Sequence, residues 1–239
     1  MKEMIKKIYS FIRHKGFFLR LKIRNIGKSS KVIFSEYWER NHWENKESKS
    51  GDGSTLEYTE NIRREIPLLL DRLNLKIILD IPCGDFNWFK EIKLSNDVSY
   101  TGGDIVDGMI YHLNTEFSSN FRKFIAIDAV TGVLPSADIW ICRDLIFHLP
   151  NKDILMLIDN FLRSDINWLL ITSHTEGDIK NKDTFVGGFR LVNLFRSPFN
   201  FPKPSFSIKD YLPGYPERYL LLYSKEILRI GRLDMEIIK

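Results

Sequence analysis

The sequence has few cysteines, no long apolar run and little net charge for its length. Its two cysteines, Cys83 and Cys142, both lie among apolar residues of the kind that form strands. Two buried free thiols fit a protein of the reducing cytoplasm better than a disulfide-stabilised secreted one, so we expect a cytoplasmic location. No run approaches the ~20 consecutive apolar residues that span a bilayer. The N-terminus also lacks the apolar core and cleavage site of a secretory signal.

Two patterns typical of ligand sites are missing as well. No group of histidine, cysteine and carboxylate residues has the spacing of metal ligands, so we predict a site without a metal ion. The G-x-G-x-x-G sequence of nicotinamide dehydrogenases is absent, which counts against that class of enzyme. What remains is a chain of 239 residues with 44% hydrophobic residues, enough for one large domain with appendages.

The charge is distributed unevenly along the chain. Residues 1–31 contain ten Lys or Arg residues and a single acid, a net charge of +9, whereas the remaining 25 bases and 30 acids give −5. Ile5, Ile8 and Ile12 recur at helical spacing, so we predict a basic helical arm over residues 1–27. Such an arm can bind an anionic membrane surface, phosphate or nucleic acid. Alternatively, it is a solvated helix that packs through its apolar stripe.

The rest of the chain alternates short apolar runs with helical or loop segments. Ser54 and Glu57 have the spacing of a capping box, which predicts that a helix begins there, and a second helix is expected after Asn151. Within residues 35–55, three aromatic residues lead into a polar stretch that ends Ser50-Gly51-Asp52-Gly53-Ser54 and has the composition of a loop. This alternation predicts an α/β fold with a Rossmann-like, doubly wound, mostly parallel sheet of about seven strands, preceded by the helical arm. The predicted strands are 76–81, 98–104, 123–127, 138–142, 167–173, 206–211 and 218–224.

Acidic residues stand at the ends of the first three predicted strands. Parallel sheets bind ligands at the carboxyl ends of their strands, near the point where the strand order reverses. Asp80 ends the first strand, Asp104 lies 24 residues later at the end of the second, and Asp128 follows the third. An acid at the position of Asp104 can accept both hydroxyl groups of a ribose. Each carboxylate alone could equally cap a turn or a helix.

The segment Asp80-x-x-Cys83-Gly84 resembles the first motif of class I S-adenosylmethionine-dependent methyltransferases, with Pro82 and Phe86 at positions where the family often has glycine. The resemblance covers about residues 54–175. It implies S-adenosylmethionine as cofactor and S-adenosylhomocysteine as product, a loop wrapped around the methionine part, Asp104 on the ribose and Asp128 on the adenine amino group. The predicted cofactor-binding residues are Asp80, Pro82, Cys83, Gly84, Trp88, Asp104, Ile105, Asp128, Ala129, Arg143, Trp38, Trp43 and Ser54.

The resemblance also suggests a division of the chain. We expect residues 1–53 to form the basic arm and a loop that covers the cofactor, and residues 54–239 to form the methyltransferase domain. Trp38 and Trp43 can shield the cofactor sulfonium or, equally, anchor the arm to the core. A proline- and phenylalanine-rich segment at about 176–216 is expected to be an insertion that binds the acceptor.

Methyl transfer to an oxygen requires a group that removes one proton. His148 and His174 follow predicted strands and are the candidate bases, with Asp144 as the alternative; His148 could also serve only as a helix-start residue. Arg143 could neutralise a phosphate or carboxylate on the acceptor. The predicted acceptor-binding residues are Arg143, Arg190, Asn193 and Asn200.

The fourth-strand segment lacks the Asn-Pro-Pro-Tyr or Asp-Pro-Pro-Tyr pattern associated with methylation of planar amino groups, which favours an oxygen acceptor. Residues 143–149 and 193–204 are similar to those of bacterial methyltransferases from surface-polysaccharide gene clusters. This similarity implies O-methylation of a sugar or phosphate-type group in glycan biosynthesis. Two alternatives stay open. One is an RNA methyltransferase that grips RNA with the arm, although nucleic acid is the less favoured partner. The other is a non-enzymatic module bound to the inner face of the membrane through residues 1–31. The sequence does not indicate an oligomeric state.

Overall fold

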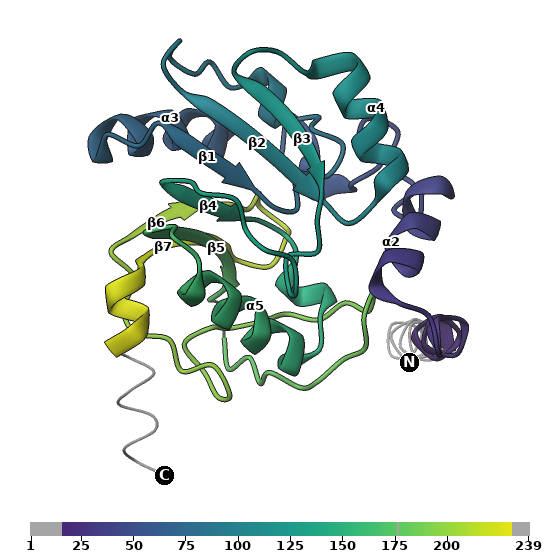
Figure 1. Cartoon of the computed structure of the whole chain (residues 1–239). Coiled ribbons are helices and arrows are strands. Elements are labelled where there is room, and N and C mark those ends of the chain that lie inside the picture. The colour runs from purple at the N-terminus through teal and green to yellow at the C-terminus, as the bar shows by residue number, and fades with distance from the viewer. Residues whose placement is uncertain (1–15, 176, 231–239) are drawn as a thin grey trace.

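The computed structural model describes residues 16–175 and 177–230, which form a seven-stranded sheet with helices on both faces (Figure 1). The strands are β1 (Ile77–Asp80), β2 (Ser99–Asp104), β3 (Arg122–Ala126), β4 (Ile139–Cys142), β5 (Trp168–His174), β6 (Phe206–Lys209) and β7 (Arg218–Ser224). The main helices are α2 (Ser30–Glu39), α3 (Glu60–Leu73), α4 (Asp107–Phe117) and α5 (Asn151–Arg163). Short 3-10 turns lie at Asp52–Ser54, Phe89–Glu91 and Ile146–His148.

The strand order is β3-β2-β1-β4-β5-β7-β6, and β7 alone runs antiparallel to the rest of the sheet. The chain builds outward from β1 to β3 and then returns to place β4 beside β1. Strand order therefore reverses between β1 and β4, where Asp80 pairs with Gly102 on one side and with Ile141 on the other. Ligands of open α/β sheets bind outside the carboxyl ends of the strands at this point.

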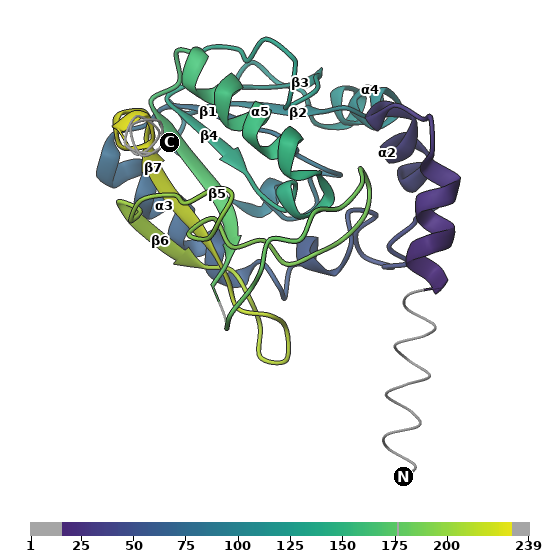
Figure 2. The same ribbon diagram turned by 90° about the horizontal axis from the view of Figure 1, so that it is seen from below.

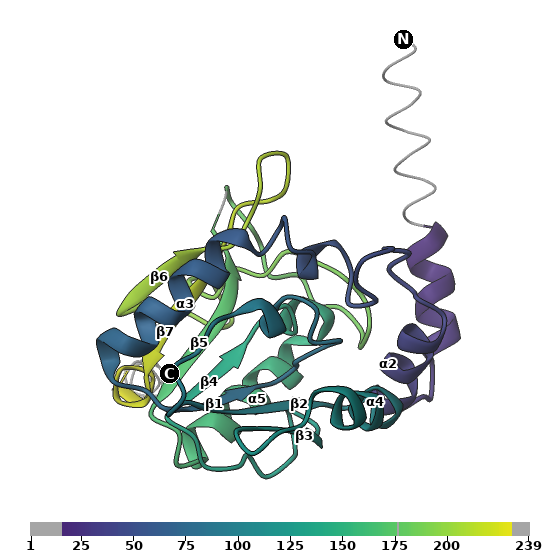
Figure 3. The same ribbon diagram turned by 90° about the horizontal axis from the view of Figure 1, so that it is seen from above.

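Two apolar layers cover the sheet, because successive residues of a strand face opposite sides. Ile78 of β1 packs in the same cluster as α3 and α4, whereas the next residue, Leu79, packs with α5 and Trp140. Figures 2 and 3, which view the molecule from opposite sides, show α5 over one face and α3 over the other. Because both faces are covered, the central strands are apolar throughout rather than alternating.

The predicted fold class is confirmed, and each predicted strand matches an observed one to within two residues. The helix predicted after Asn151 is α5. Both cysteines are buried and free, as expected. Residues 16–25 of the predicted arm are helical. The prediction rested on three residues that lie outside the described residues: Ile5, Ile8 and Ile12.

Helix α2 was not predicted; Ser29 caps it by accepting a hydrogen bond from the backbone N–H of Val32. One local prediction is wrong, because the capping box at Ser54 and Glu57 does not form. Helix α3 begins at Glu60, and Ser54 lies in a separate 3-10 turn. Among the described residues, none of the helices is long and apolar enough to cross a bilayer.

Candidate functional site

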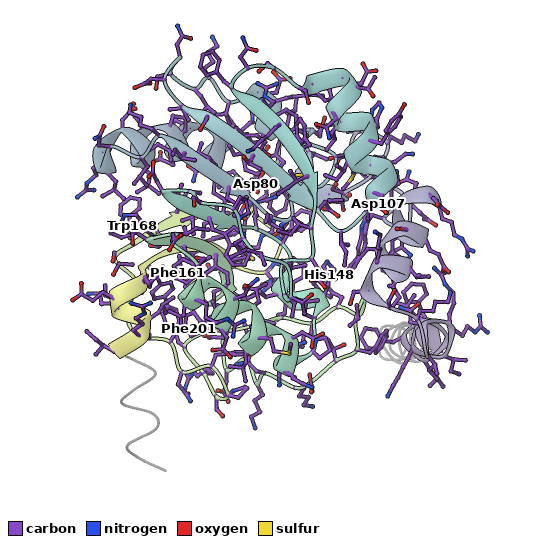
Figure 4. All side chains as sticks on the ribbon, viewed as in Figure 1. Asp80, Asp107, His148, Phe161, Trp168 and Phe201 are labelled. Atoms are coloured by element: carbon purple, nitrogen blue, oxygen red, sulfur yellow. The ribbon has the colours of Figure 1, made fainter. Side chains whose placement is uncertain are left out.

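A cavity of about 400 Å³ opens at the carboxyl ends of β1 to β5, a volume in the ~300–1,000 Å³ range of small-molecule sites. It brings together most of the residues singled out in the sequence, and Figure 4 labels His148, one of those on its wall. The predicted residues that line it are Trp38, Trp43, Ser54, Pro82, Cys83, Gly84, Trp88, Asp104, Ile105, Asp128, Ala129, Arg143, Asp144, His148 and His174.

Asp104, at the end of β2, holds the strand and the loop after β1 together. Its Oδ1 accepts a hydrogen bond from the backbone N–H of Val106 (3.1 Å), and its Oδ2 accepts one from Gly84 (3.3 Å). Burial raises the pKa of this carboxyl to about 6. Each oxygen can accept a further hydrogen bond, since a carboxylate has about four acceptor positions. Asp104 is therefore held rigidly in the wall with spare capacity for ligand hydroxyl groups.

Asp128 follows β3 and is half-buried in the same wall. Its Oδ1 accepts a hydrogen bond from the backbone N–H of Val130 (2.8 Å), and its Oδ2 accepts one from the Thr131 hydroxyl (3.1 Å). The carboxylate thus caps the turn after β3 and faces the cavity at once, so the two interpretations of this residue are compatible.

Asp80 is buried and is not among the residues that line the cavity. The Tyr100 hydroxyl donates a hydrogen bond to Asp80 Oδ2 (2.8 Å), and Oδ1 has no hydrogen-bond partner among the described residues. Burial raises the pKa of this carboxyl to about 7. The sequence suggested that Asp80 contacts a bound ligand directly. The structure instead keeps Asp80 out of the cavity wall.

The loop after β1 turns through two residues in the left-handed region, Gly84 (φ +54°) and Phe86 (φ +60°). A Cβ at Gly84 would lie 2.5 Å from the Ser50 Oγ, so a side chain at this position would collide with the covering loop. Phe86 keeps the backbone geometry of a glycine although it costs about 1–3 kcal/mol. Its ring packs against Tyr100 and Phe124, and this burial offsets the cost.

Residues 45–54, which we call the covering loop, are tied to the loop after β1. The Ser48 and Ser50 hydroxyls donate hydrogen bonds to the Asp85 carboxylate (2.8 and 3.1 Å), and the Asp85 N–H donates one to Ser50 Oγ (2.9 Å). Asn87 Nδ2 donates to the Ser54 carbonyl (3.1 Å). Asp85 was not among the predicted site residues, although its place directly after Gly84 was a usable signal.

The aromatic residues before the covering loop both line the cavity and anchor the arm. Trp43 lies against His148, with ring centroids 5.0 Å apart, and against Tyr37 at 5.8 Å. The Lys49 Nζ lies 4.6 Å from the centre of the Trp38 ring. Trp38 and Trp43 thus both line the cavity, and Trp43 also packs against Tyr37, which contacts the arm through Asn25.

Four charged side chains meet beyond β4, and three of them, Arg143, Asp144 and Arg218, line the cavity. Arg143 donates two hydrogen bonds to Asp210 (both 2.9 Å) and one to the Gly53 carbonyl (2.6 Å). Arg218 Nη2 lies 3.0 Å from Asp144 Oδ2. Burial raises the pKa of Asp144, but the guanidinium groups of Arg143 and Arg218 more than offset this, so its pKa is lowered. The four formal charges cancel.

Asp144 therefore stays ionised and paired, which makes it a poor proton acceptor. Asp210 and Arg218 were not among the predicted site residues. Asp210 directly follows β6 and Arg218 begins β7, both far along the chain from Arg143.

His148 and His174 both line the cavity, and their hydrogen bonds differ. His148 Nδ1 lies 2.7 Å from the Gly188 carbonyl oxygen, whereas His174 Nδ1 accepts a hydrogen bond from the backbone N–H of Val192 (3.3 Å). Burial lowers the pKa of each imidazole to about 4, so both are neutral near pH 7.

Three predicted acceptor-binding residues do not reach the cavity. Arg190 donates hydrogen bonds to the Leu149 carbonyl and to Asn151 Oδ1 (both 2.6 Å). Asn193 Oδ1 accepts one from the backbone N–H of Phe195 (2.9 Å). Asn200 lies on the surface of the same segment, in the left-handed region (φ +46°). Arg190 and Asn193 hold the 187–201 segment in shape, and we no longer assign any of the three to an acceptor.

Two other residues of the 187–201 segment, Gly188 and Phe189, do reach the site. The carbonyl of Gly188 meets His148, and Phe189 lines the cavity. Further lining residues absent from the sequence-based set include Tyr58, Phe147, Tyr215 and Arg218. Within residues 16–175 and 177–230, no group of three or more His, Cys, Asp or Glu side chains is arranged to hold a metal ion.

No protein-family model matches this chain, and no curated protein matches it by sequence. Solved structures do match its fold. One is a 1,6-didemethyltoxoflavin-N1-methyltransferase from Burkholderia thailandensis, crystallised with 1,6-didemethyltoxoflavin and S-adenosylhomocysteine. It is 12% identical, with 81% of this chain and 86% of that chain covered and a TM-score of 0.55.

A second is the magnesium protoporphyrin IX methyltransferase of Synechocystis PCC 6803 with bound S-adenosylhomocysteine (13% identity, 82% and 99% covered, TM-score 0.54). A third is human N-acetylserotonin methyltransferase in complex with S-adenosylmethionine (13% identity, 83% of this chain and 57% of that chain covered, TM-score 0.52). At these identities the likeness establishes a common fold, the Rossmann-like sheet of class I methyltransferases.

Proposed function

We propose that this protein is an S-adenosylmethionine-dependent methyltransferase. The observation that carries the proposal is Asp104, a buried carboxylate at the end of β2 that accepts a hydrogen bond from the Gly84 backbone N–H in the wall of the cavity at the carboxyl ends of the strands. Solved proteins with the same fold have been crystallised with S-adenosylmethionine or S-adenosylhomocysteine.

The residues present fit this cofactor. Asp104 has spare acceptor positions for the two ribose hydroxyls, and Asp128 has them for the adenine amino group. The surroundings of Gly84 leave no room for a Cβ. A glycine also lets a ligand approach the backbone closely. Trp38 and Trp43 supply aromatic faces, which attract a cation by roughly 0.5–2 kcal/mol.

When bound, the cofactor supplies a methyl group attached to a sulfonium, which leaves as a neutral thioether. The protein then has to exclude water, hold the acceptor in line and take up one proton. The covering loop, fixed to Asp85, closes one side of the cavity. We assign the proton uptake to His148, because its hydrogen bond to Gly188 leaves Nε2 as the nitrogen free of hydrogen.

Asp144 supports this role from a distance. Its negative charge raises the pKa of His148, against the larger effect of burial. It thereby stabilises the imidazolium that forms as the proton is taken up. Because Asp144 is itself paired with Arg143 and Arg218, we assign it a positioning role instead of the role of base.

For the acceptor, we propose a hydroxyl group of a sugar, as part of cell-surface glycan biosynthesis. Aromatic rings of Tyr58, Phe147 and Phe189 line the cavity together with Arg143, Asp144 and Arg218, while Asp210 is buried and paired with Arg143. Rings can pack on the apolar face of a sugar, and the charged side chains can hydrogen-bond its hydroxyls. Since the four charges cancel, the wall has no excess positive charge to balance a phosphate, which favours the hydroxyl over a phosphate-type acceptor.

The test is transfer of a labelled methyl group from S-adenosylmethionine to bacterial envelope oligosaccharides, followed by mass spectrometry of the product. We expect one sugar residue to gain a methyl ether. If the label enters RNA or a small amine instead, while S-adenosylhomocysteine binds normally, the glycan part of the proposal is wrong and the cofactor part stands.

A further inference from the structure

The helix over residues 16–25 leaves apolar side chains in contact with solvent. Leu19, Ile23 and Ile26 are 59%, 60% and 71% exposed. They are spaced by four and three residues, and the turn at Ile26 continues the helical hydrogen bonding through the Ile23 carbonyl (3.3 Å). Residues at this spacing lie on one face of a helix. Leu21 and Asn25, on the opposite face, are buried against the domain.

This stripe differs from isolated exposed apolar residues, which are common on protein surfaces. Basic residues accompany it. Residues 16–31 contain five Lys or Arg residues and no acid, and Arg20 and Lys22 are exposed beside the stripe. By contrast, the chain after residue 31 carries a net charge of −5. The helix therefore combines an apolar stripe with positive charge on an otherwise acidic molecule.

We propose that this surface, made by Leu19, Arg20, Lys22, Ile23 and Ile26, docks onto a membrane that contains anionic lipids. Such helices lie in the interface with the apolar face buried among acyl chains and the basic residues at the headgroups. The acidic body is repelled by the same surface, so attraction through the arm alone orients the molecule.

The positive charge and the apolar residues on one helix face favour a membrane over two other partners. A symmetric dimer through this stripe would bring two strongly basic arms together, which costs electrostatic energy. Nucleic acid would satisfy Arg20 and Lys22 but would leave the apolar stripe in water. An anionic bilayer satisfies both features at once.

The helix is also tied to the cavity. Asn25 Nδ2 donates hydrogen bonds to the Tyr37 hydroxyl (3.0 Å) and to the Val186 carbonyl (3.3 Å), and Tyr37 lines the cavity. Figures 1 and 2 show the helix beside α2 at the edge of the molecule. A helix held on lipid therefore keeps the cavity close to the bilayer.

Vesicle flotation with the full chain tests this proposal, with phosphatidylcholine vesicles that contain or lack phosphatidylglycerol. We expect wild type to bind only the anionic vesicles. Loss of two large apolar side chains in Leu19→Ser/Ile23→Ser should weaken the partition by at least about tenfold. The matched control is Val133→Ser, which removes a side chain that is 92% exposed elsewhere on the surface and should bind as wild type does. Arg20→Glu/Lys22→Glu should also weaken binding, and added salt should do the same.

The proposal is overturned if wild type fails to bind anionic vesicles, or if the Leu19→Ser/Ile23→Ser variant binds them as well as wild type. It is also overturned if light scattering shows a dimer that the apolar variant disperses while vesicle binding is absent. The proposal is likewise overturned if a single-stranded RNA binds the protein and only the Arg20→Glu/Lys22→Glu variant weakens that binding. Circular dichroism should show that all variants keep the fold, since the substituted side chains are exposed.

Discussion

The Nδ1 atom of His148 lies 2.7 Å from the carbonyl oxygen of Gly188. A carbonyl oxygen only accepts hydrogen bonds, so Nδ1 carries the hydrogen of the neutral ring and Nε2 is free to accept a proton. His174 has the reverse arrangement, since its Nδ1 accepts from Val192 and its Nε2 therefore carries the hydrogen. The two histidines are thus not equivalent as bases.

Matched asparagine substitutions should separate the two histidines. His148→Asn keeps an N–H for the Gly188 carbonyl but removes Nε2, so kcat should fall by about 10²–10⁴-fold. His174→Asn keeps an acceptor for Val192 and should lose much less. Both variants should bind S-adenosylhomocysteine nearly as wild type does. Steady-state kinetics with saturating cofactor checks this. Equal losses of kcat in the two variants would contradict the assignment of His148.

The contact between Asp85 and the covering loop should control access to the cavity. Asp85→Ala removes the acceptor of the Ser48 and Ser50 hydroxyls, and we expect a loss of about 1–3 kcal/mol of the free energy of docking the loop. Trypsin should then cut faster after Lys46 and Lys49, which are exposed on this loop. Asp97→Ala is the control, because Asp97 is paired with Lys76 instead. Identical digestion rates for the two variants would remove Asp85 from this role.

The buried pair of Arg143 and Asp210 should show strong coupling. Arg143→Met leaves the Asp210 carboxylate with one fewer partner in a fully buried site, which we expect to cost about 3–5 kcal/mol of unfolding free energy. Arg143→Met/Asp210→Leu removes both charges and should be less destabilised than the sum of the single variants. Urea denaturation of the four proteins measures this double-mutant cycle. Additive losses would show that the two side chains do not act as a pair.

Stability should depend on pH through Asp80. Burial raises the pKa of this carboxyl to about 7 in the folded protein, above the value of about 3.9 in unfolded chains. Between those values the folded state binds a proton that the unfolded state does not, so this contribution to the free energy of unfolding rises as the pH falls from 8 to 5. Burial lowers the pKa of His148 and His174 to about 4, so their contributions have the opposite sign below about pH 6.5.

Asp80→Asn removes the Asp80 contribution and keeps an acceptor for the Tyr100 hydroxyl. In urea denaturation without cofactor, the difference in unfolding free energy between the variant and wild type should therefore favour the variant more at pH 8 than at pH 5. Asp97→Asn should show no such gain towards pH 8, because Asp97 is exposed and hydrogen bonds from Lys76 and Ser95 lower its pKa. A difference between Asp80→Asn and wild type that is constant with pH would contradict the raised pKa.

The strands could be predicted from the sequence because their burial on both faces makes them continuous apolar runs. The start of α3 could not, because contacts distant in sequence decide it. The Ser54 carbonyl accepts a hydrogen bond from Asn87, and the Leu56 N–H donates one to Glu47, so residues 54–59 form turns. These bonds compete with the local capping box that Ser54 and Glu57 would form.

The part of the cavity wall that holds Asp104 and Asp128 could be predicted from the sequence, because both residues stand at strand ends that the topology brings to one edge. The part beyond β4 could not. Arg218 and Asp210 come from the antiparallel end of the sheet, and nothing in their local sequence marks them as partners of Arg143. Arg190 and Asn193 were chosen for their polarity, but a segment without regular structure uses such groups to satisfy its own backbone.

The most direct test of the proposed activity is calorimetric titration of the protein with S-adenosylhomocysteine. The account predicts saturable binding to wild type and a loss of affinity of roughly 10–100-fold in Asp104→Asn, which weakens charged hydrogen bonds to the ribose. Asp107→Asn should bind as wild type does, because Asp107, which Figure 4 labels, starts the next helix. Its side chain is exposed and paired with Lys31. No binding by wild type, or equal affinity of the Asp104→Asn variant, would contradict the central claim.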